Sequence, residues 1–180
     1  MLLKQNNSVL VIIDIQERLA RVMKYRDAVI RNSSILIKAA HRLNIPIITT
    51  LQYTKGLGSL VDELKSELMP DPKIEKLHFN SCDEPSFMDC LRSLNKPQVV
   101  LVGMECHVCI LQTAISLVEN GFGVHVVQDA VASRTENHWK NGLSRMQRYG
   151  VEITTTESAL FELLGKAGTP EFKELSVLIR

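Results

Sequence analysis

Short apolar segments alternate with longer amphipathic segments along the 180 residues of the chain. Six segments are rich in valine, isoleucine and threonine and have the length of strands. We expect strands over Ser8–Asp14, Ile45–Leu51, Ile74–Leu77, Pro97–Gly103, Gly123–Gln128 and Val151–Thr155. The first reads SVLVIID and is apolar up to its final acid, as expected for a strand buried on both faces.

Apolar residues at helical spacing occupy most of the stretches between these strands. We expect helices over Asp27–Leu43, Leu60–Met69, Pro85–Leu94, His107–Asn120, Asn137–Tyr149, Glu157–Leu164 and Thr169–Leu175. Pro70 and Pro72 should end the second of these helices, because proline cannot continue a helix. Gln52–Ser59 contains two glycines and is predicted to be a loop.

Alternating strands and helices predict an α/β fold. With right-handed crossovers they give a Rossmann-like, three-layer αβα sandwich around a doubly wound, mainly parallel six-stranded sheet. No linker divides the chain, so we expect one domain over residues 1–180. Such sheets bind ligands at the carboxyl ends of their strands, which makes the polar residues there the candidates for function.

The composition excludes several classes of protein. Hydrophobic residues make up 45% of the chain and charged residues 23%, as in ordinary globular domains. A net charge of +1 gives no strong field for nucleic acid or a membrane surface, so we expect neither as a partner. No apolar run reaches the roughly 18 residues of a membrane span, and the first residues lack a signal-peptide cleavage site. We therefore predict a cytoplasmic protein whose four cysteines are reduced thiols.

Two of the predicted strands end in residues that could carry proton-transfer chemistry. Asp14 closes the first strand, where it could accept a proton or simply cap the following helix. Lys76 lies near the end of the third predicted strand, in the segment KIEKLHF. A lysine beside a thiol favours the thiolate, but a lysine at such a position can equally be an exposed surface residue.

The junction GMECHVCIL, after the fourth predicted strand, contains Cys106 and Cys109. A thiol at a helix N-terminus faces free N–H groups, which would lower its pKa and offer donors to an oxyanion. Alternatively, both cysteines could be buried as small apolar residues. The C-x-x-C spacing also allows a redox pair. The sequence contains no second pair of ligands that would complete a zinc site with these cysteines.

These three strand ends resemble the isochorismatase-like cysteine hydrolases, which include nicotinamidases and N-carbamoylsarcosine amidohydrolases. The similarity covers nearly the whole chain and rests on VIIDIQ, EKLHFNS, VLVGMECHVCILQTA, QDAVASR and ITTTESALFELL. The stretches TLQYTKGLG and GMECHVC are most similar to the isochorismatase domain-containing proteins. The resemblance implies that Cys109 is the nucleophile, Asp14 its proton acceptor and Lys76 a stabiliser of the charge.

The same resemblance implies further features of the site. The backbone N–H groups of Glu105 and Cys109 would form the oxyanion hole, and a non-proline cis peptide would join Met104 to Glu105. The metal-binding Asp-x-His of nicotinamidases is missing from TLQYTKGLGSL, so we expect no metal, no cofactor and no nicotinamide substrate. Isochorismatases themselves lack the cysteine, which favours acyl chemistry here. The expected activity is hydrolysis of a small amide-type C–N bond through a thioester.

Other residues near these motifs are candidates for supporting roles. Five could line the substrate pocket: Gln16, Gln52, Tyr53, His78 and Phe79. His78 would share the face of Lys76 if the strand continued to it. The Glu105 side chain could shape the pocket or face a partner helix. Relatives commonly oligomerise, so we expect a homo-oligomer, whose contacts His138 and Trp139 could serve. Two alternatives stay open: a redox protein using Cys106 and Cys109, and a non-catalytic binding protein.

Overall fold

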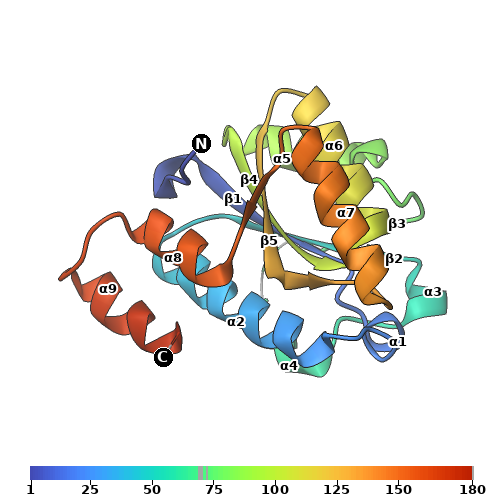
Figure 1. Ribbon diagram of the computed structural model, residues 1–180, viewed down its shortest axis with the longest axis horizontal. Coiled ribbons are helices and arrows are strands. Elements are labelled where there is room, and N and C mark those ends of the chain that lie inside the picture. The colour runs from blue at the N-terminus through green and yellow to red at the C-terminus, as the bar shows by residue number, and fades with distance from the viewer. Residues whose placement is uncertain (69–70, 72, 180) are drawn as a thin grey trace.

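The computed structural model describes residues 1–68, 71 and 73–179. Its core is a six-stranded sheet in the order β3-β2-β1-β4-β5-β6, in which every pair of neighbours is parallel (Figure 1). The strands are β1 (Ser8–Ile13), β2 (Ile47–Gln52), β3 (Lys73–Lys76), β4 (Gln98–Met104), β5 (Gly123–Ala132) and β6 (Glu152–Thr154). This confirms the predicted α/β fold with its doubly wound sheet.

Helices connect the strands. The α-helices are α1 (Glu17–Ala20), α2 (Arg26–Arg42), α3 (Thr54–Leu57), α4 (Asp62–Lys65), α5 (Pro85–Ser93), α6 (Leu111–Glu119), α7 (Glu136–Arg148), α8 (Thr156–Leu164) and α9 (Pro170–Leu175). Short 3₁₀ turns cover Gln5–Asn7, Ser81–Asp83 and Ser176–Ile179, and one π-helical turn covers Cys106–Ile110. No helix in these described residues has the length and apolarity to cross a membrane.

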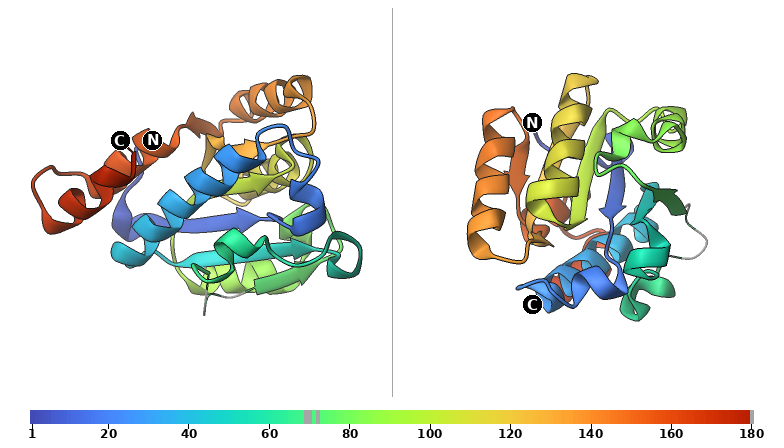
Figure 2. Two further views of the ribbon diagram at one scale, coloured as in Figure 1. Left: turned by 90° about the horizontal axis from the view of Figure 1, so that it is seen from below. Right: turned by 90° about the vertical axis from the view of Figure 1, so that its right-hand side faces the viewer.

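Two hydrophobic cores lie on opposite faces of the sheet, because successive side chains of a strand point to opposite sides. Leu10 and Ile12 of β1 belong to the core under α2 and α8. Val9, Val11 and Ile13 belong to the core under α5, α6 and α7. Figure 2 shows the resulting three layers, with α6 and α7 on one side of the sheet and α2 on the other.

Most predicted elements are present, and their ends differ by a few residues. Gln52–Ser59 is not wholly a loop, because Gln52 ends β2 and Thr54–Leu57 forms the single turn α3. β5 runs four residues past Gln128, since a bulge lets it pair again with β4 after the register shifts between Leu101 and Gly103.

Two helix predictions need correction or lie partly outside the described structure, and one short helix was not predicted. The helix predicted from His107 begins instead as the π-helical turn and becomes α-helical at Leu111. In the predicted Leu60–Met69 helix, only α4 is a regular α-helix. Met69 and the stops Pro70 and Pro72 lie outside the described residues. The short helix α1 was not predicted, because one turn leaves too little sequence for a helical pattern to show.

Candidate active site

The strand order creates a crevice at the carboxyl ends of β1 and β4. Crossovers leave these two neighbouring strands in opposite directions, which is the arrangement where open α/β sheets bind ligands. Ile13, the last residue of β1, pairs with Gly103 of β4. Asp14 follows directly after β1, and Glu105 and the π-helical turn follow directly after β4. The two predicted strand ends therefore meet at one place.

Asp14 forms a fully buried ion pair with Lys76. The Lys76 ammonium donates to Asp14 Oδ2 over 2.8 Å, and both side chains have 0% exposure to solvent. The Thr50 hydroxyl donates to the other oxygen, Asp14 Oδ1, also over 2.8 Å. The alternative that Asp14 caps a helix is wrong, because α1 begins after Gln16 and has no side-chain cap.

Lys76 is surrounded by acceptors, as a buried ammonium must be if its desolvation is to be offset. Besides Asp14, it donates to Gln52 Oε1 at 2.7 Å and to the backbone carbonyls of His78 at 3.2 Å and Phe79 at 3.5 Å. The alternative of an exposed surface lysine is therefore wrong. β3 brings Lys76 to the crevice although it lies two strands away from β1.

Cys109 lies in the π-helical turn with its thiol against Asp14. The residue is 5% exposed, and burial, followed by the Asp14 charge, raises the pKa of its thiol to about 12. The Lys76 charge and a hydrogen bond from the Glu105 backbone lower this pKa in part, and the hydrogen bond with Asp14 raises it. The expectation that the helix terminus lowers the pKa of this thiol is wrong in the resting site, because desolvation outweighs the favourable charges.

The backbone leading to Cys109 is tightly specified. A cis peptide joins Met104 to Glu105, as the family resemblance implied. The Glu105 carbonyl then accepts hydrogen bonds from the N–H groups of Val108 at 3.0 Å and Ile110 at 3.2 Å. The bond to Ile110 spans five residues and makes this turn π-helical rather than α-helical. Such turns are frequent at functional sites.

The Glu105 side chain joins the π-helical turn to the end of β5. Its Oε2 accepts hydrogen bonds from the backbone N–H of Arg134 at 3.3 Å and from Arg134 Nε at 3.2 Å. The Glu105 carboxylate is thus paired within the chain. Close by, the His107 ring lies 2.9 Å from the Ser133 hydroxyl and stacks on His138 at 4.4 Å between ring centroids.

Cys106 has different neighbours from Cys109. Its sulfur donates toward the Trp139 carbonyl at 3.7 Å and lies under α7, where a Cβ on Gly142 would come within 3.0 Å of it. Burial raises the pKa of Cys106 to about 12. These contacts fit a packed apolar thiol, the alternative role predicted for these cysteines.

The five residues predicted to line the pocket fall into two groups. Gln16 and Gln52 are buried, and all their side-chain polar groups bind atoms of the chain itself. Tyr53, His78 and Phe79 lie at the surface beside them. His78 does not share the face of Lys76, because β3 ends at Lys76 and the His78 side chain turns to solvent.

Thr50 is a site residue that the sequence analysis missed. Its hydroxyl contacts Asp14 directly. Alternation along IITTLQ places Thr50 on the same strand face as Gln52, which is a usable signal. That signal has no meaning until β2 is known to lie between the strands that carry Asp14 and Lys76.

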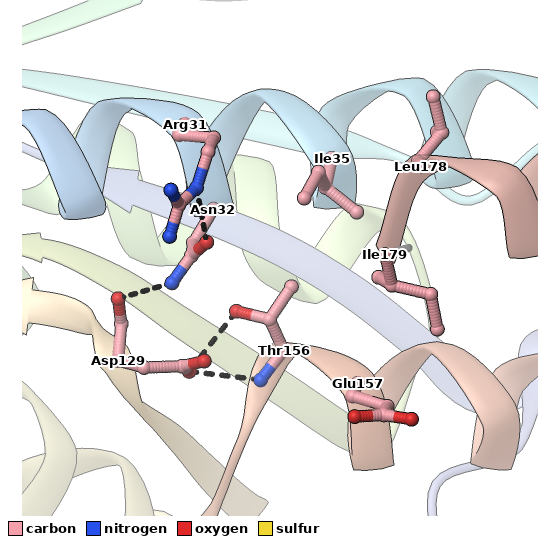
Figure 3. A pocket seen from close by; sticks show the side chains of 8 residues that line it. All are labelled: Arg31, Asn32, Ile35, Asp129, Thr156, Glu157, Leu178 and Ile179. Carbon is pink, nitrogen blue, oxygen red and sulfur yellow. Dashed lines mark hydrogen bonds between the residues drawn. The ribbon is translucent and has the colours of Figure 1, made fainter.

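A separate cavity of about 350 Å³ lies between α2, β5, α8 and the C-terminal turn (Figure 3). Its polar groups already hold these elements together. Asp129 Oδ1 accepts from the Thr156 N–H at 2.8 Å and hydroxyl at 3.0 Å, and Asn32 Nδ2 donates to the Asp129 carbonyl at 2.6 Å. Among the described residues, no cluster of three or more His, Cys, Asp or Glu side chains is arranged to hold a metal ion.

Solved structures with a similar fold include three with a TM-score above 0.9. The MAR1 ribonuclease from Caenorhabditis elegans is 40% identical, with a TM-score of 0.94 over 99% of this chain and 92% of that one. The YcaC gene product from Escherichia coli, an octameric hydrolase of unknown specificity, is 26% identical. Its TM-score is 0.93 over 99% of this chain and 90% of that one.

Similar sequences come from distant organisms. The secreted isochorismatase effector Isc1 of Phytophthora sojae is 40% identical over 97% of this chain and 85% of its own length. Isochorismatase domain-containing protein 2 of Danio rerio is 40% identical over 98% of this chain and 89% of its own. The family model for the isochorismatase domain matches residues 8–158. The chain with this crevice therefore belongs to the isochorismatase family.

Proposed function

We propose that this protein is a cysteine hydrolase that cleaves a small amide-type C–N bond through a thioester on Cys109. The observation that carries the proposal is the buried pair of Asp14 and Lys76, 2.8 Å apart, with the Cys109 thiol near enough for both of their charges to shift its pKa. Burying two opposite charges costs several kcal/mol per ion before their attraction is counted. A fold needs no such arrangement merely to pack a cysteine.

The first step follows from the high pKa of Cys109. A thiol with a pKa of about 12 is protonated at neutral pH, so it needs a base as it attacks. Asp14 takes the proton from Sγ while sulfur bonds to the substrate carbonyl carbon. The Lys76 ammonium balances the negative charge that develops, and the backbone N–H groups of Glu105 and Cys109 donate to the oxyanion.

The second half of the reaction returns the site to its starting state. Asp14 gives its proton to the leaving nitrogen as the C–N bond breaks, and the thioester remains on Cys109. A water molecule then gives a proton to Asp14 and attacks the thioester carbonyl. The C–S bond breaks, the acid leaves, and the proton returns to sulfur. No cofactor enters this sequence.

The test is a turnover screen over small amides, lactams and carbamoyl compounds, with a Cys109→Ala variant beside the wild type. We expect the variant to lose turnover by a factor of about 10⁴ or more, as when other covalent nucleophiles are removed. Iodoacetamide, followed by peptide mass mapping, should label Cys109 in the active protein and stop turnover. Full activity in the Ala variant would rule out the proposal.

The screen also separates the remaining alternatives. The similar Caenorhabditis elegans structure is described as a ribonuclease, so one RNA substrate belongs in the panel. RNA cleavage that survives Cys109→Ala would point to a different site. A redox role instead requires a disulfide between Cys106 and Cys109 after mild oxidation, which the same mapping detects.

Assembly and compartment belong to the same proposal. The octameric Escherichia coli neighbour supports a homo-oligomer here, which light scattering on the purified protein would measure. We propose a cytoplasmic protein because all four cysteines are free thiols, and reduced thiols suit that compartment. The secreted Phytophthora sojae relative makes extracellular fractions the necessary control in localisation experiments.

A further inference from the structure

β2 lies between the two strands that bring Asp14 and Lys76 to the crevice. The sheet order at this edge is β3-β2-β1, with Asp14 after β1 and Lys76 at the end of β3. Thr50 and Gln52 are two residues apart on β2, so their side chains project from the same face. Each reaches one member of the ion pair.

Thr50 fixes the carboxylate of Asp14. Its hydroxyl donates to Oδ1 at 2.8 Å, while the ammonium of Lys76 occupies Oδ2 at 2.8 Å. With a donor on each oxygen, the plane of the carboxylate is set relative to the sheet. Thr50 has 0% exposure, so water does not replace its hydroxyl.

Gln52 fixes the ammonium of Lys76. Its Oε1 accepts from Nζ at 2.7 Å, and its Nε2 donates to the Leu77 carbonyl at 2.7 Å, which determines the orientation of the amide. The Gln52 backbone is itself held by the Gln16 side chain, through the N–H at 2.7 Å and the carbonyl at 3.0 Å. The acceptor for Lys76 is therefore neutral and held from two sides.

We infer that Thr50 and Gln52 are positioning residues that set where the charges of Asp14 and Lys76 lie relative to the Cys109 sulfur. We call this pair the β2 clamp, and the inference rests on the roles proposed above for the three charged or nucleophilic residues. Gln52 gives Lys76 a second strong acceptor without adding a second negative charge beside the thiol. The ammonium thus keeps its effect on the sulfur.

The experiment measures the reactivity of Cys109 directly and needs no substrate. The rate of iodoacetamide labelling at Cys109 is followed by peptide mass mapping from pH 6 to pH 10 on the folded full chain. The variants are Thr50→Val and Gln52→Leu, which remove one hydrogen bond to a charged group each with little change of shape. Since the thiol pKa of about 12 lies above this range, the labelling rate itself is the readout. We expect each variant to label about fivefold or more slowly than the wild type across the range.

Two further variants separate positioning from packing. Thr50→Ser keeps the hydroxyl and should label at nearly the wild-type rate. Thr49→Val makes the same substitution on the neighbouring residue, which faces the other side of β2. The Thr49 hydroxyl is buried and has no hydrogen-bond partner in the described part of the chain. This variant should leave the labelling rate unchanged throughout this pH range.

If the clamp variants label at the wild-type rate, a Lys76→Met variant shows whether the β2 clamp or the proposed effect of Lys76 on the thiol is wrong. Should Lys76→Met slow labelling while Thr50→Val and Gln52→Leu do not, the β2 clamp is refuted and the proposed function stands. Should Lys76→Met also leave labelling unchanged, the proposed effect of Lys76 on the thiol is refuted. A lower melting temperature in the clamp variants with unaltered labelling would show a structural role only.

Discussion

At the scale of single residues, Cys109 combines the position of a nucleophile with the pKa of an inert buried thiol. Desolvation is the largest cause, and the neighbouring Asp14 charge adds to it. The same carboxylate that suppresses the free thiolate is also the group that we propose as the proton acceptor. In the proposed mechanism, the sulfur therefore keeps its proton until a substrate carbonyl is present to react with it.

Replacing Asp14 should separate these two effects. In Asp14→Asn the like charge beside the sulfur is gone, so the pKa of Cys109 should fall and iodoacetamide labelling at pH 8 should speed up. Turnover should fall by about 10²–10⁴, because the base is lost. Labelling rates and turnover measured on the same preparation check this. Slower labelling of the Asn variant at every pH would contradict the charge argument.

Strand patterns made Asp14 and Lys76 candidates for the site, and the start of a helix pattern made both Cys106 and Cys109 candidates. The family resemblance then pointed to Cys109 as the nucleophile. The sequence could not identify Thr50, whose importance depends on which strands are neighbours. It also led to the wrong direction for the pKa of Cys109. Burial is a property of the whole site, and no local motif reports how much water reaches the sulfur.

At the scale of elements, Gly103 allows β1 and β4 to approach each other where the crevice forms. Its φ is +125°, and a Cβ there would lie 1.9 Å from the Ile13 carbonyl oxygen. Backbone atoms cannot yield as the tip of a flexible side chain can. This glycine therefore sets the spacing between the strand before Asp14 and the strand before Glu105.

Gly103→Ala should consequently destabilise the fold by about 3 kcal/mol or more, as expected when backbone strain and steric overlap combine. Gly121→Ala is the matched control, because Gly121 also has a positive φ, +86°, but nothing lies within 4 Å of its Cβ position. We expect only about 1–2 kcal/mol there. Denaturant unfolding of both variants measures the difference, and equal losses would contradict the overlap.

Most elements followed from hydrophobic periodicity, including strands β1 and β2 and helix α7. The exceptions are elements whose form depends on tertiary contacts. The last residues of β5 are strand because they pair with β4 beyond a bulge. The turn before α6 is π-helical because the Glu105 carbonyl accepts from Ile110, a contact that helical spacing alone does not reveal.

At the scale of the whole molecule, the buried thiols link stability to alkaline pH. The pKa values of Cys106 and Cys109 are raised to about 12 in the folded protein, whereas an unfolded thiol has a pKa of about 8.5. Below that value both states keep their protons. Above it the unfolded chain loses protons that the folded chain retains, so stability should fall as pH rises towards 12.

Each such thiol contributes a slope of about 1.4 kcal/mol per pH unit in this window. The pH dependence of unfolding by denaturant should therefore be shallower in Cys109→Ser by the contribution of one thiol. Lysine side chains titrate in both proteins and cancel in the comparison. If the free energy of unfolding fell with pH at the same slope in wild type and variant between pH 9 and 10.5, the raised pKa of Cys109 would be contradicted.

The hydrogen-bond acceptors around Lys76 have a consequence for how the substrate specificity of the proposed activity could evolve. Four oxygen atoms of the chain accept hydrogen bonds from the Lys76 ammonium, which has three protons. The ammonium therefore has no free proton to donate to a ligand. Under the proposed function, substrate selection is then expected from exposed side chains near the site, such as Tyr53 and Phe79. Substitutions of these exposed residues would change which substrates bind while the buried residues stay the same, so the same reaction could evolve toward new substrates.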